Sequence, residues 1–311
     1  MLTVTNLRKE FSSVIAVDRV SFEVGRGEIF GLLGPNGAGK TTTIRMALNI
    51  LQPDGGEIRY DGERFSEKTR NIIGYLPEER GLYKKSKVFD TILYFAQLRG
   101  MNAGAARAVA YRWLHRFSLL EHRERKVEEL SKGNQQKVQF ICALIHDPVL
   151  VILDEPFSGL DPVNQILFKD VFMELKQAGK AVVYSTHQMD QAERLSDTLC
   201  LIDHGRVVLS GSVRNIKKRY GKNSVHIEFD GNGAFMDSLP GVRRAIMYEH
   251  SAELELGDGV AGNALLGEIV GRVEVRKFEL LEPSLQSIFI QVVGMPDNGK
   301  RGVFAREVNV K

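Results

Sequence analysis

Residues 34–41 read Gly34-Pro35-Asn36-Gly37-Ala38-Gly39-Lys40-Thr41 and fill every fixed position of the pattern G-x-x-x-x-G-K-S/T. The pattern answers a physical demand, because a phosphate chain carries several negative charges and needs many hydrogen-bond donors at short range. The three glycines let the backbone turn in unusual conformations and bring its N–H groups close to phosphate oxygens. Lys40 is expected to reach the β- and γ-phosphates of a nucleotide, and the Thr41 hydroxyl is expected to bind Mg²⁺.

The segments on either side of this loop fit the same interpretation. Residues 28–33 form a short apolar run, as a buried strand would, and residues 42–49 predict a helix whose N-terminus points at the anion. Thr42, at the start of this helix, joins residues 34–41 as a candidate nucleotide-binding residue. The alternative, a glycine-rich turn without a ligand, is disfavoured because a strand, the loop and a helix follow one another in the required order.

The composition is that of a folded chain without a strong charge bias. The chain has 311 residues, 43% of them hydrophobic, which suits one large domain or two. A net charge of +3 is too balanced to indicate a nucleic-acid partner. Cys142 and Cys200 lie in apolar surroundings without metal-ligand spacing, which is typical of reduced cysteines in a cytosolic protein. The first ten residues lack the pattern of a signal peptide, and no apolar run is long enough to span a membrane.

The order of apolar patterns divides the chain into parts. Residues 1–30 alternate with period two, and apolar strands then alternate with helical segments as far as residue 195, which predicts a largely parallel sheet. Residues 86–128 carry apolar residues at helical spacing, and their aromatic side chains are expected in a core rather than around a cofactor. The expected parts are a first domain at 1–219 with a helical subdomain at about 86–147, a small α+β domain at 220–294 and a flexible tail at 295–311.

Two acids follow the unbroken apolar strand predicted at residues 149–153. An acid directly after a buried strand lies at the carboxyl edge of a parallel sheet, where phosphate sites form. Asp154 is therefore a candidate ligand of Mg²⁺, and Glu155 is a candidate for orienting or deprotonating an attacking water. The alternative is a helix N-cap or a solvated acidic turn.

A third motif precedes this strand and reads Leu130-Ser131-Lys132-Gly133-Asn134. It resembles the signature Leu-Ser-Gly-Gly-Gln of the ATP-binding cassette (ABC) ATPases, and the order of the three motifs is also that of this family. Two of the five positions depart from the signature, since Lys132 replaces the first glycine and Asn134 replaces the glutamine. Ser131 and Gly133, which face the γ-phosphate of ATP in the family, are both present.

The resemblance extends to residues outside the three motifs. Residues 158–161 resemble the family's D-loop, which makes Asp161 a candidate nucleotide-binding residue. His187 resembles the switch histidine and joins Lys40 and Glu155 as a candidate catalytic residue, although a lone histidine after a strand is more often structural. Phe11 lies where family members stack an aromatic ring on adenine, and a buried core aromatic is an equal alternative.

One departure from the family concerns the segment after the strand predicted at residues 72–76. Family members place a glutamine there, where it senses Mg²⁺ and water. This chain has Glu78, which offers a hard oxygen ligand for Mg²⁺ together with a negative charge. Glu78 either serves the same role or slows hydrolysis.

The resemblance implies an α/β fold, a P-loop NTPase cassette with a mostly parallel sheet, an antiparallel β part and a helical subdomain, followed by the small C-terminal α+β domain. It implies ATP and Mg²⁺ as cofactors and a second ABC cassette, most simply an identical copy, packed head to tail around ATP. It also implies an integral membrane permease subunit as partner, with this chain on the cytoplasmic face of the cell membrane. Residues 282–294 resemble the extra domain of bacterial exporter cassettes, such as sodium and drug-efflux systems.

Two other functions remain open from sequence. A soluble ABC ATPase that acts on nucleic acid or the ribosome would usually carry two cassettes, long coiled coils or zinc-binding cysteines. None of these features is present in the sequence, so no nucleic-acid partner is expected. A non-catalytic, nucleotide-gated binding module would need a damaged catalytic set, and only Glu78 and the altered signature point to it.

Overall fold

The computed structural model describes residues 1–79, 81–220, 224–257, 259–281 and 283–293. The described residues form two compact units, one at Met1–Ser212 and one that begins at Val213. The sequence places the division after residue 219, whereas the second unit also includes the helix α8 (Val213–Tyr220). The tail predicted at 295–311 lies outside the described residues. No described helix combines the length and the apolar character needed to cross a membrane.

The first unit is built on a six-stranded sheet with the order β5-β6-β7-β3-β8-β9, in which all neighbours are parallel except the pair β8 and β9. Its strands are β3 (Ile29–Leu33), β5 (Ile73–Leu76), β6 (Leu150–Leu153), β7 (Ala181–Thr186), β8 (Thr198–Asp203) and β9 (Arg206–Ser212). This order makes β3 and β6 the two neighbours of β7. The carboxyl ends of these three strands therefore meet at one edge of the sheet.

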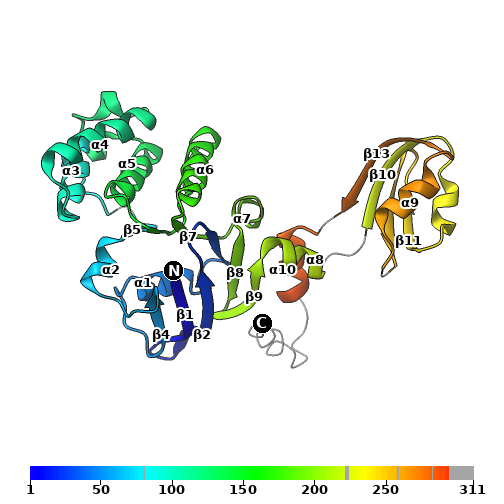
Figure 1. Cartoon of the computed structure of the whole chain (residues 1–311), viewed down its shortest axis with the longest axis horizontal. Helices are drawn as coiled ribbons and strands as arrows, with labels where there is room; N and C mark the ends of the chain where they lie inside the picture. Colours follow the sequence, from blue (N-terminus) through cyan, green and yellow to red (C-terminus); the bar gives the residue numbers. More distant parts are fainter. Residues whose placement is uncertain (80, 221–223, 258, 282, 294–311) are drawn as a thin grey trace. The chain divides into compact units, whose positions relative to one another are not determined.

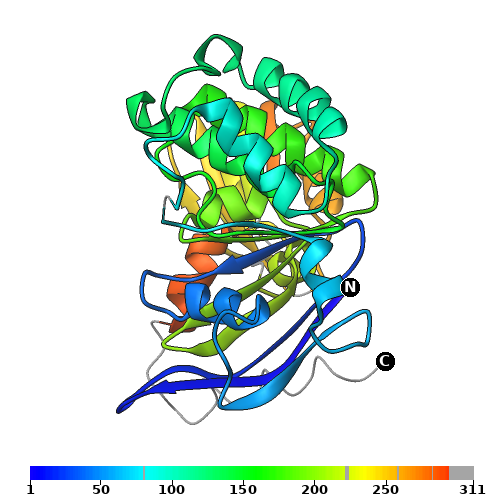
Figure 2. The same cartoon turned by 90° about the vertical axis from the view of Figure 1, so that its left-hand side faces the viewer.

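Both faces of the central sheet are covered, which explains the unbroken apolar runs in its strands. In β6, Val151 and Leu153 belong to one hydrophobic core, and Leu150 and Ile152 belong to another. Figures 1 and 2 show the helices α3 to α6 on one side of this sheet and the strands β1, β2 and β4 on the other.

The helical side of the first unit contains a cluster of packed aromatic rings. Phe140 stacks on Phe168 with ring centroids 4.1 Å apart, and both rings contact Phe117, which is fully buried. The expectation that the aromatic side chains of residues 86–128 lie in a core is therefore confirmed for Phe117, whereas Tyr94 and Tyr111 are each 46% exposed. The helices of this unit are α1 (Lys40–Ala47), α2 (Glu67–Asn71), α3 (Val88–Leu98), α4 (Ala103–Arg116), α5 (Lys132–Leu144), α6 (Pro162–Gln177) and α7 (Met189–Leu195), with short 3₁₀ helices at Leu120–His122 and Val127–Glu129.

The other side of the first unit carries an antiparallel sheet with the order β2-β1-β4, formed by β1 (Leu2–Phe11), β2 (Val14–Val24) and β4 (Gly55–Tyr60). It packs on the central sheet through a shared core in which the ring of Phe22 stacks on that of Phe30 at 4.9 Å. Both cysteines are buried and unpaired, and burial raises the pKa of the Cys200 thiol to about 12.

The second unit has an antiparallel sheet with the order β11-β12-β10-β13 and its own hydrophobic core. Apolar residues alternate along its strand at residues 224–230, and Val225, Ile227 and Phe229 all point into this core. The remaining elements of the unit are β10 (Ser224–Asp230), a 3₁₀ helix (Ala234–Ser238), β11 (Val242–Met247), β12 (Ser251–Leu256), α9 (Gly262–Ile269), β13 (Glu274–Leu281) and α10 (Leu285–Val293).

Candidate nucleotide site

The phosphate-binding loop follows β3 and is held from two sides by backbone. Gly39 has φ +103°, and a Cβ there would lie 2.4 Å from the carbonyl oxygen of Ala16. Gly34 has φ +151°, and a Cβ there would lie 2.1 Å from the carbonyl oxygen of Ile202. Any side chain at these two positions would clash with backbone that cannot move aside, so the loop requires glycine for its shape.

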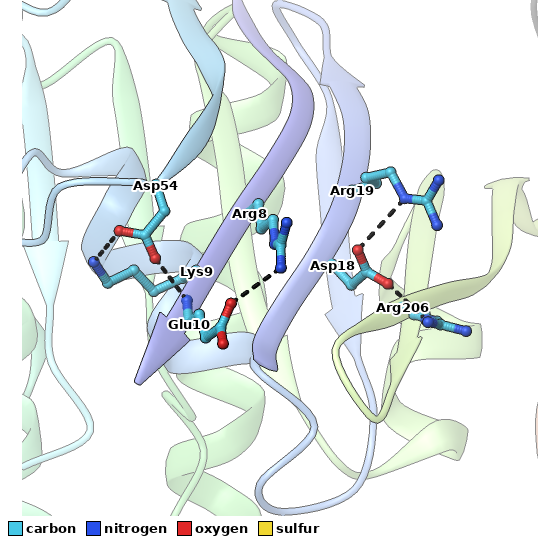
Figure 3. A network of polar contacts seen from close by, with 7 residues as sticks. All are labelled: Arg8, Lys9, Glu10, Asp18, Arg19, Asp54 and Arg206. Carbon is cyan, nitrogen blue, oxygen red and sulfur yellow. Dashed lines mark hydrogen bonds and ion pairs between the residues drawn. The ribbon is translucent and has the colours of Figure 1, made fainter. Parts of the chain in front are cut away.

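A turn between β8 and β9 supports the loop from behind. The Gly205 N–H donates to the carbonyl of Ala38 at 3.0 Å, and the Asp18 N–H donates to the carbonyl of Gly205 at 2.8 Å. The Asp18 side chain also pairs with Arg206 at 2.9 Å, and Figure 3 shows this contact beside the strand β2. The loop is therefore tied to β2 and to the β8–β9 turn at the same point.

Lys40 begins the helix α1 and lies inside the loop. Its Nζ donates to the carbonyls of Gly34 at 2.7 Å and Pro35 at 3.1 Å, and it lies 3.7 Å from Oε1 of Glu155. Gly39 caps α1 without a side chain, so the first N–H groups of the helix, including those of Thr41 and Thr42, have no capping partner within the helix. An ammonium group and a helix N-terminus thus lie together, which suits a bound phosphate chain.

Asp154 follows β6 and is completely buried. Its Oδ1 accepts a hydrogen bond from the Ser185 hydroxyl, while its Oδ2 has no hydrogen-bond partner among the described residues. A buried carboxylate oxygen without a partner is costly, and a hard cation with its waters would satisfy it. The donor set therefore fits Mg²⁺. Burial, together with the negative charge of Asp154, also raises the pKa of Tyr75 to about 12.

Glu155 is held in a strained conformation next to two candidate partners. It has φ +48°, a left-handed conformation that is rare for residues other than glycine and often marks a functional site. Its N–H donates to the Ser185 hydroxyl at 2.9 Å. Its Oε1 lies 3.0 Å from Nδ1 of His187, and Lys40 lies near the same oxygen. The structure therefore brings together the three residues that the sequence nominated for catalysis.

Ser185 is a residue of this site that the sequence analysis missed. It is fully buried in β7, where it accepts from Glu155 and donates to Asp154, so it fixes both acids at once. The sequence offered one sign of this role, a hydroxyl at the end of an apolar strand and two residues before His187. The sign could be interpreted only once the sheet order showed that β7 lies beside β6, the strand that Asp154 follows.

Glu78 lies in the segment after β5, next to β6 in the sheet. The Asp154 N–H donates to the carbonyl of Leu76 at 2.8 Å, which brings this segment beside the buried acid, and the Glu78 side chain itself is exposed. Gln139 of α5 holds the backbone on both sides of Glu78, because its Nε2 donates to the carbonyls of Pro77 at 3.2 Å and Glu79 at 3.1 Å. Gln139 was not predicted either.

The stretch Ser131–Gly133 lies at the start of α5. The Asn134 N–H donates to the Ser131 hydroxyl at 3.3 Å, so Ser131 is the N-cap of this helix and is itself exposed. A Cβ at Gly133 would lie 3.6 Å from the carbonyl oxygen of Gly159, an ordinary contact. Among the described residues, no hydrogen bond or ion pair joins Ser131 or Gly133 to the phosphate-binding loop of the same chain.

Asp161 and Phe11 have different structural roles: the first caps a helix, and the second is an exposed ring at the end of a strand. Asp161 is the N-cap of α6, and the N–H of Asn164, which donates to its carboxylate at 2.9 Å, lowers the pKa of Asp161. Phe11 ends β1 and is 46% exposed, so the alternative of a buried core aromatic is wrong. Lys9 lies 5.5 Å from its ring centroid and pairs with Asp54, as Figure 3 shows, and this hydrogen bond lowers the pKa of Asp54.

Comparisons with known proteins agree with this geometry. The sequence model of the ABC transporter family matches residues 17–158, and that of the C-terminal domain of DrrA1-3-like ATP-binding proteins matches residues 211–293. The chain is 43% identical to the ABC transporter ATP-binding protein YhaQ of Bacillus subtilis, over 94% of this chain and 99% of that protein.

Other relatives and solved structures are similar over most of the chain. It is 29% identical to the linearmycin resistance ATP-binding protein LnrL of Bacillus subtilis, over 94% of this chain and 98% of that protein. It is 34% identical to the Nod factor export ATP-binding protein I of Rhizobium sp. (strain N33), over 94% and 97% respectively. A solved ATP-binding subunit of an ABC transporter has a TM-score of 0.67 at 31% identity, covering 71% of this chain and 93% of that one.

A phosphate-binding loop, a buried acid pair and a histidine thus meet at one sheet edge in a chain that matches relatives of one kind along nearly its whole length. These observations together show that the chain is an ATP-hydrolysing, ATP-binding subunit of the ABC transporter family.

Proposed function

We propose that this chain hydrolyses ATP with Lys40, Glu155 and His187 as catalytic residues and powers an exporter through a separate membrane subunit. The observation that carries the proposal is the position of Glu155 Oε1, which lies 3.0 Å from His187 and 3.7 Å from Lys40. The linearmycin resistance and Nod factor export proteins named above support the exporter reading, because their names describe resistance and export.

Each catalytic residue has a role that follows from its place. Lys40 moves its ammonium from the loop carbonyls to the β- and γ-phosphates, where it offsets developing negative charge. Glu155 orients the attacking water and accepts its proton, and His187 holds the Glu155 carboxylate and the water in position. The remaining loop residues from Gly34 to Thr42 bind the phosphates, through backbone N–H groups at every position except Pro35, and Phe11 offers an exposed ring to adenine.

Three residues are proposed to hold Mg²⁺, one of which is Asp154 with its unpartnered oxygen. Asp154 supplies that oxygen, Thr41 supplies a hydroxyl at the start of α1, and Glu78 supplies a second carboxylate from the segment after β5. When bound, the cation neutralises charge on the β- and γ-phosphates. Ser185 orients Asp154 by donating to its other oxygen.

A second copy of the chain is proposed to complete the site. Ser131 and Gly133 begin an α-helix, are not joined to their own phosphate-binding loop, and leave the Ser131 side chain exposed. A helix N-terminus with an exposed hydroxyl stabilises a γ-phosphate, so these residues suit the ATP held by a partner packed head to tail. ATP then lies between the two copies, and hydrolysis releases them.

The helical subdomain offers a surface for the membrane subunit. Tyr83, Tyr94 and Tyr111 are between 46% and 56% exposed, and the rings of Tyr83 and Tyr94 pack edge to face at 5.6 Å. Leu98 in α3 is 63% exposed. Large apolar side chains that are exposed in this way are typical of a protein interface. Bound there, the chain works on the cytoplasmic face of the cell membrane.

The test is co-purification of the full chain carrying Glu155→Gln from its own membranes with ATP and Mg²⁺. We expect the variant to keep ATP, to form a dimer and to bring down a membrane protein with several spans. Recovery of ribosomes or DNA without a membrane protein would contradict the transporter proposal and favour the soluble alternative.

A further inference from the structure

Two glutamines connect the loop at residues 158–161 with the helix that follows His187. Gln165, in the first turn of α6, donates from Nε2 to the carbonyl of Leu160 at 3.1 Å. Gln191, in α7, donates from Nε2 to Oε1 of Gln165 at 3.0 Å. Both side chains are half-buried, so water competes only partly with these hydrogen bonds.

The backbone fixes the direction of this chain of hydrogen bonds. The carbonyl of Leu160 only accepts, so Gln165 must turn its amide nitrogen toward it. The oxygen of Gln165 then faces Gln191, which must present its own nitrogen. Neither amide can be reversed alone without placing two acceptors or two donors face to face, so the two glutamines are set as a pair.

Each end of the pair reaches a different functional part of the chain. At one end, α7 begins at Met189, two residues after His187, whose Nδ1 lies 3.0 Å from Glu155. At the other end, Leu160 follows Gly159, whose carbonyl oxygen lies 3.6 Å from the position of a Cβ on Gly133. The loop at residues 158–161 therefore touches the stretch that a second copy would receive.

We propose that Gln165 and Gln191 are positioning residues that couple His187 to the loop at residues 158–161 and, through it, to Gly133. This inference rests on the proposed function, because it takes His187 as catalytic and Gly133 as part of the partner's ATP site. When His187 shifts at one ATP, α7 pulls on Gln165, Leu160 moves, and the contact at the second ATP changes. The two ATP sites of the dimer thereby sense each other.

The first test uses single substitutions that keep the shape of the side chain. Gln165→Glu places a carboxylate oxygen against the carbonyl of Leu160, and Gln191→Glu leaves Gln165 facing two acceptors with one amide nitrogen. The loss of one such hydrogen bond is expected to lower kcat about fivefold. The KM for ATP should stay within about twofold, because among the described residues no hydrogen bond or ion pair joins Gln165 or Gln191 to the phosphate-binding loop.

The second test restores the connection with different chemistry. In the double variant Gln165→Arg, Gln191→Glu, the introduced guanidinium can donate both to the carbonyl of Leu160 and to the introduced carboxylate. This variant is expected to recover most of the kcat that Gln191→Glu alone loses. Gln177→Glu adds a charge at the exposed end of the same helix and serves as the matched control, with kcat unchanged.

The outcomes separate this inference from the proposed function. All variants are measured as full chains, with thermal unfolding as a check that they are folded. If His187→Ala keeps normal turnover, the catalytic role of His187 fails and the coupling fails with it. If His187→Ala is impaired while both single glutamine variants turn over normally, only the coupling is overturned. A double variant no better than Gln191→Glu alone also overturns it.

Discussion

The phosphate-binding loop and the Ser131–Gly133 stretch are both glycine-containing turns that open a helix, yet they are held in opposite ways. In the loop, Gly39 has a positive φ, its Cβ would strike the backbone, and Lys40 fills the interior. In the other stretch, Ser131 caps its own helix, and a Cβ on Gly133 would make only an ordinary contact.

This difference separates a loop that is shaped within the chain from a stretch that lies on its surface. The loop needs its glycines in order to fold, whereas Gly133 meets no such constraint and is proposed to face the ATP of a second copy. The same difference explains why Lys132 is tolerated in place of the family's glycine. Lys132 is exposed in the first turn of α5, where no backbone constraint excludes a side chain.

The largest expected effect comes from removing the negative charge of Glu155, which lies beside Lys40 of the phosphate-binding loop. Glu155→Gln should lower ATP turnover by at least about 100-fold, because the water loses its base, while ATP binding is retained. ATP hydrolysis and size-exclusion chromatography with ATP measure both effects. Glu174→Gln, which removes an exposed partner of Arg116, is the control. Normal turnover of the Glu155 variant would exclude its catalytic role.

The comparison itself is tested by placing the same methyl group in both turns. Gly39→Ala should weaken ATP binding by about tenfold or more, because positive φ and the clash with Ala16 together cost about 1–3 kcal/mol. Gly133→Ala should leave ATP binding by the isolated chain unchanged, since its Cβ fits. Binding of a fluorescent ATP analogue, with thermal unfolding alongside, measures the pair. Equal losses in both variants would refute the proposed difference.

A smaller effect distinguishes Gln139 from Gln135, two of the glutamines of α5 that donate to backbone carbonyls. Gln139→Leu frees the segment around Glu78, and we expect half-maximal ATPase to require about fivefold more Mg²⁺, the effect of one lost hydrogen bond. Gln135→Leu removes similar bonds to Val127 and Leu130, away from that segment, and should not change the Mg²⁺ requirement. A similar Mg²⁺ response in both variants would show that Glu78 does not bind the cation.

The smallest expected effect lies at the far end of α5 and depends on pH. Burial lowers the pKa of His146 to about 4, and its Nε2 lies 3.1 Å from the carbonyl of Ile73. Because the folded chain resists protonation, this contribution to stability is complete above the ordinary histidine pKa of about 6.5 and is lost as the pH falls toward 4. The thermal unfolding midpoint should fall over this range. His146→Gln, which cannot titrate there, should flatten the fall, and an unchanged profile would contradict the assignment.

Sequence predicted the parts of the fold that depend on local patterns. Residues 34–41 were identified because the backbone of the loop requires glycine at particular positions, and these glycines therefore occur at a fixed spacing in the sequence. The strands at 149–153 and 181–186 were identified because both faces are buried, which leaves unbroken apolar runs. Asp154 and Glu155 followed as acids that end such a strand, and His187 followed from the resemblance to the ABC family.

The remaining features depend on which elements are neighbours, and a single sequence does not encode this locally. Ser185, Gln139 and the pair Gln165 and Gln191 act on residues between five and 62 positions away, through contacts that arise only in the folded chain. The strands β8 and β9 were not predicted, although the turn at 203–205 was visible as Asp-His-Gly. The strand β11 was missed because its residues are only partly buried and do not alternate clearly.

The support of the phosphate-binding loop by Gly205 has a consequence for how the protein is made. The loop is among the first segments to leave the ribosome. The strand before it, β3, pairs with β7 and β8, which are synthesised much later. The carbonyl of Ala38 in the loop has no N–H of Gly205 to accept from until residue 205 has been made. A nascent chain that stops before residue 205 therefore has the phosphate-binding residues without the walls that shape them. The ability to bind ATP arises late in synthesis and all at once, when distant segments close around the loop.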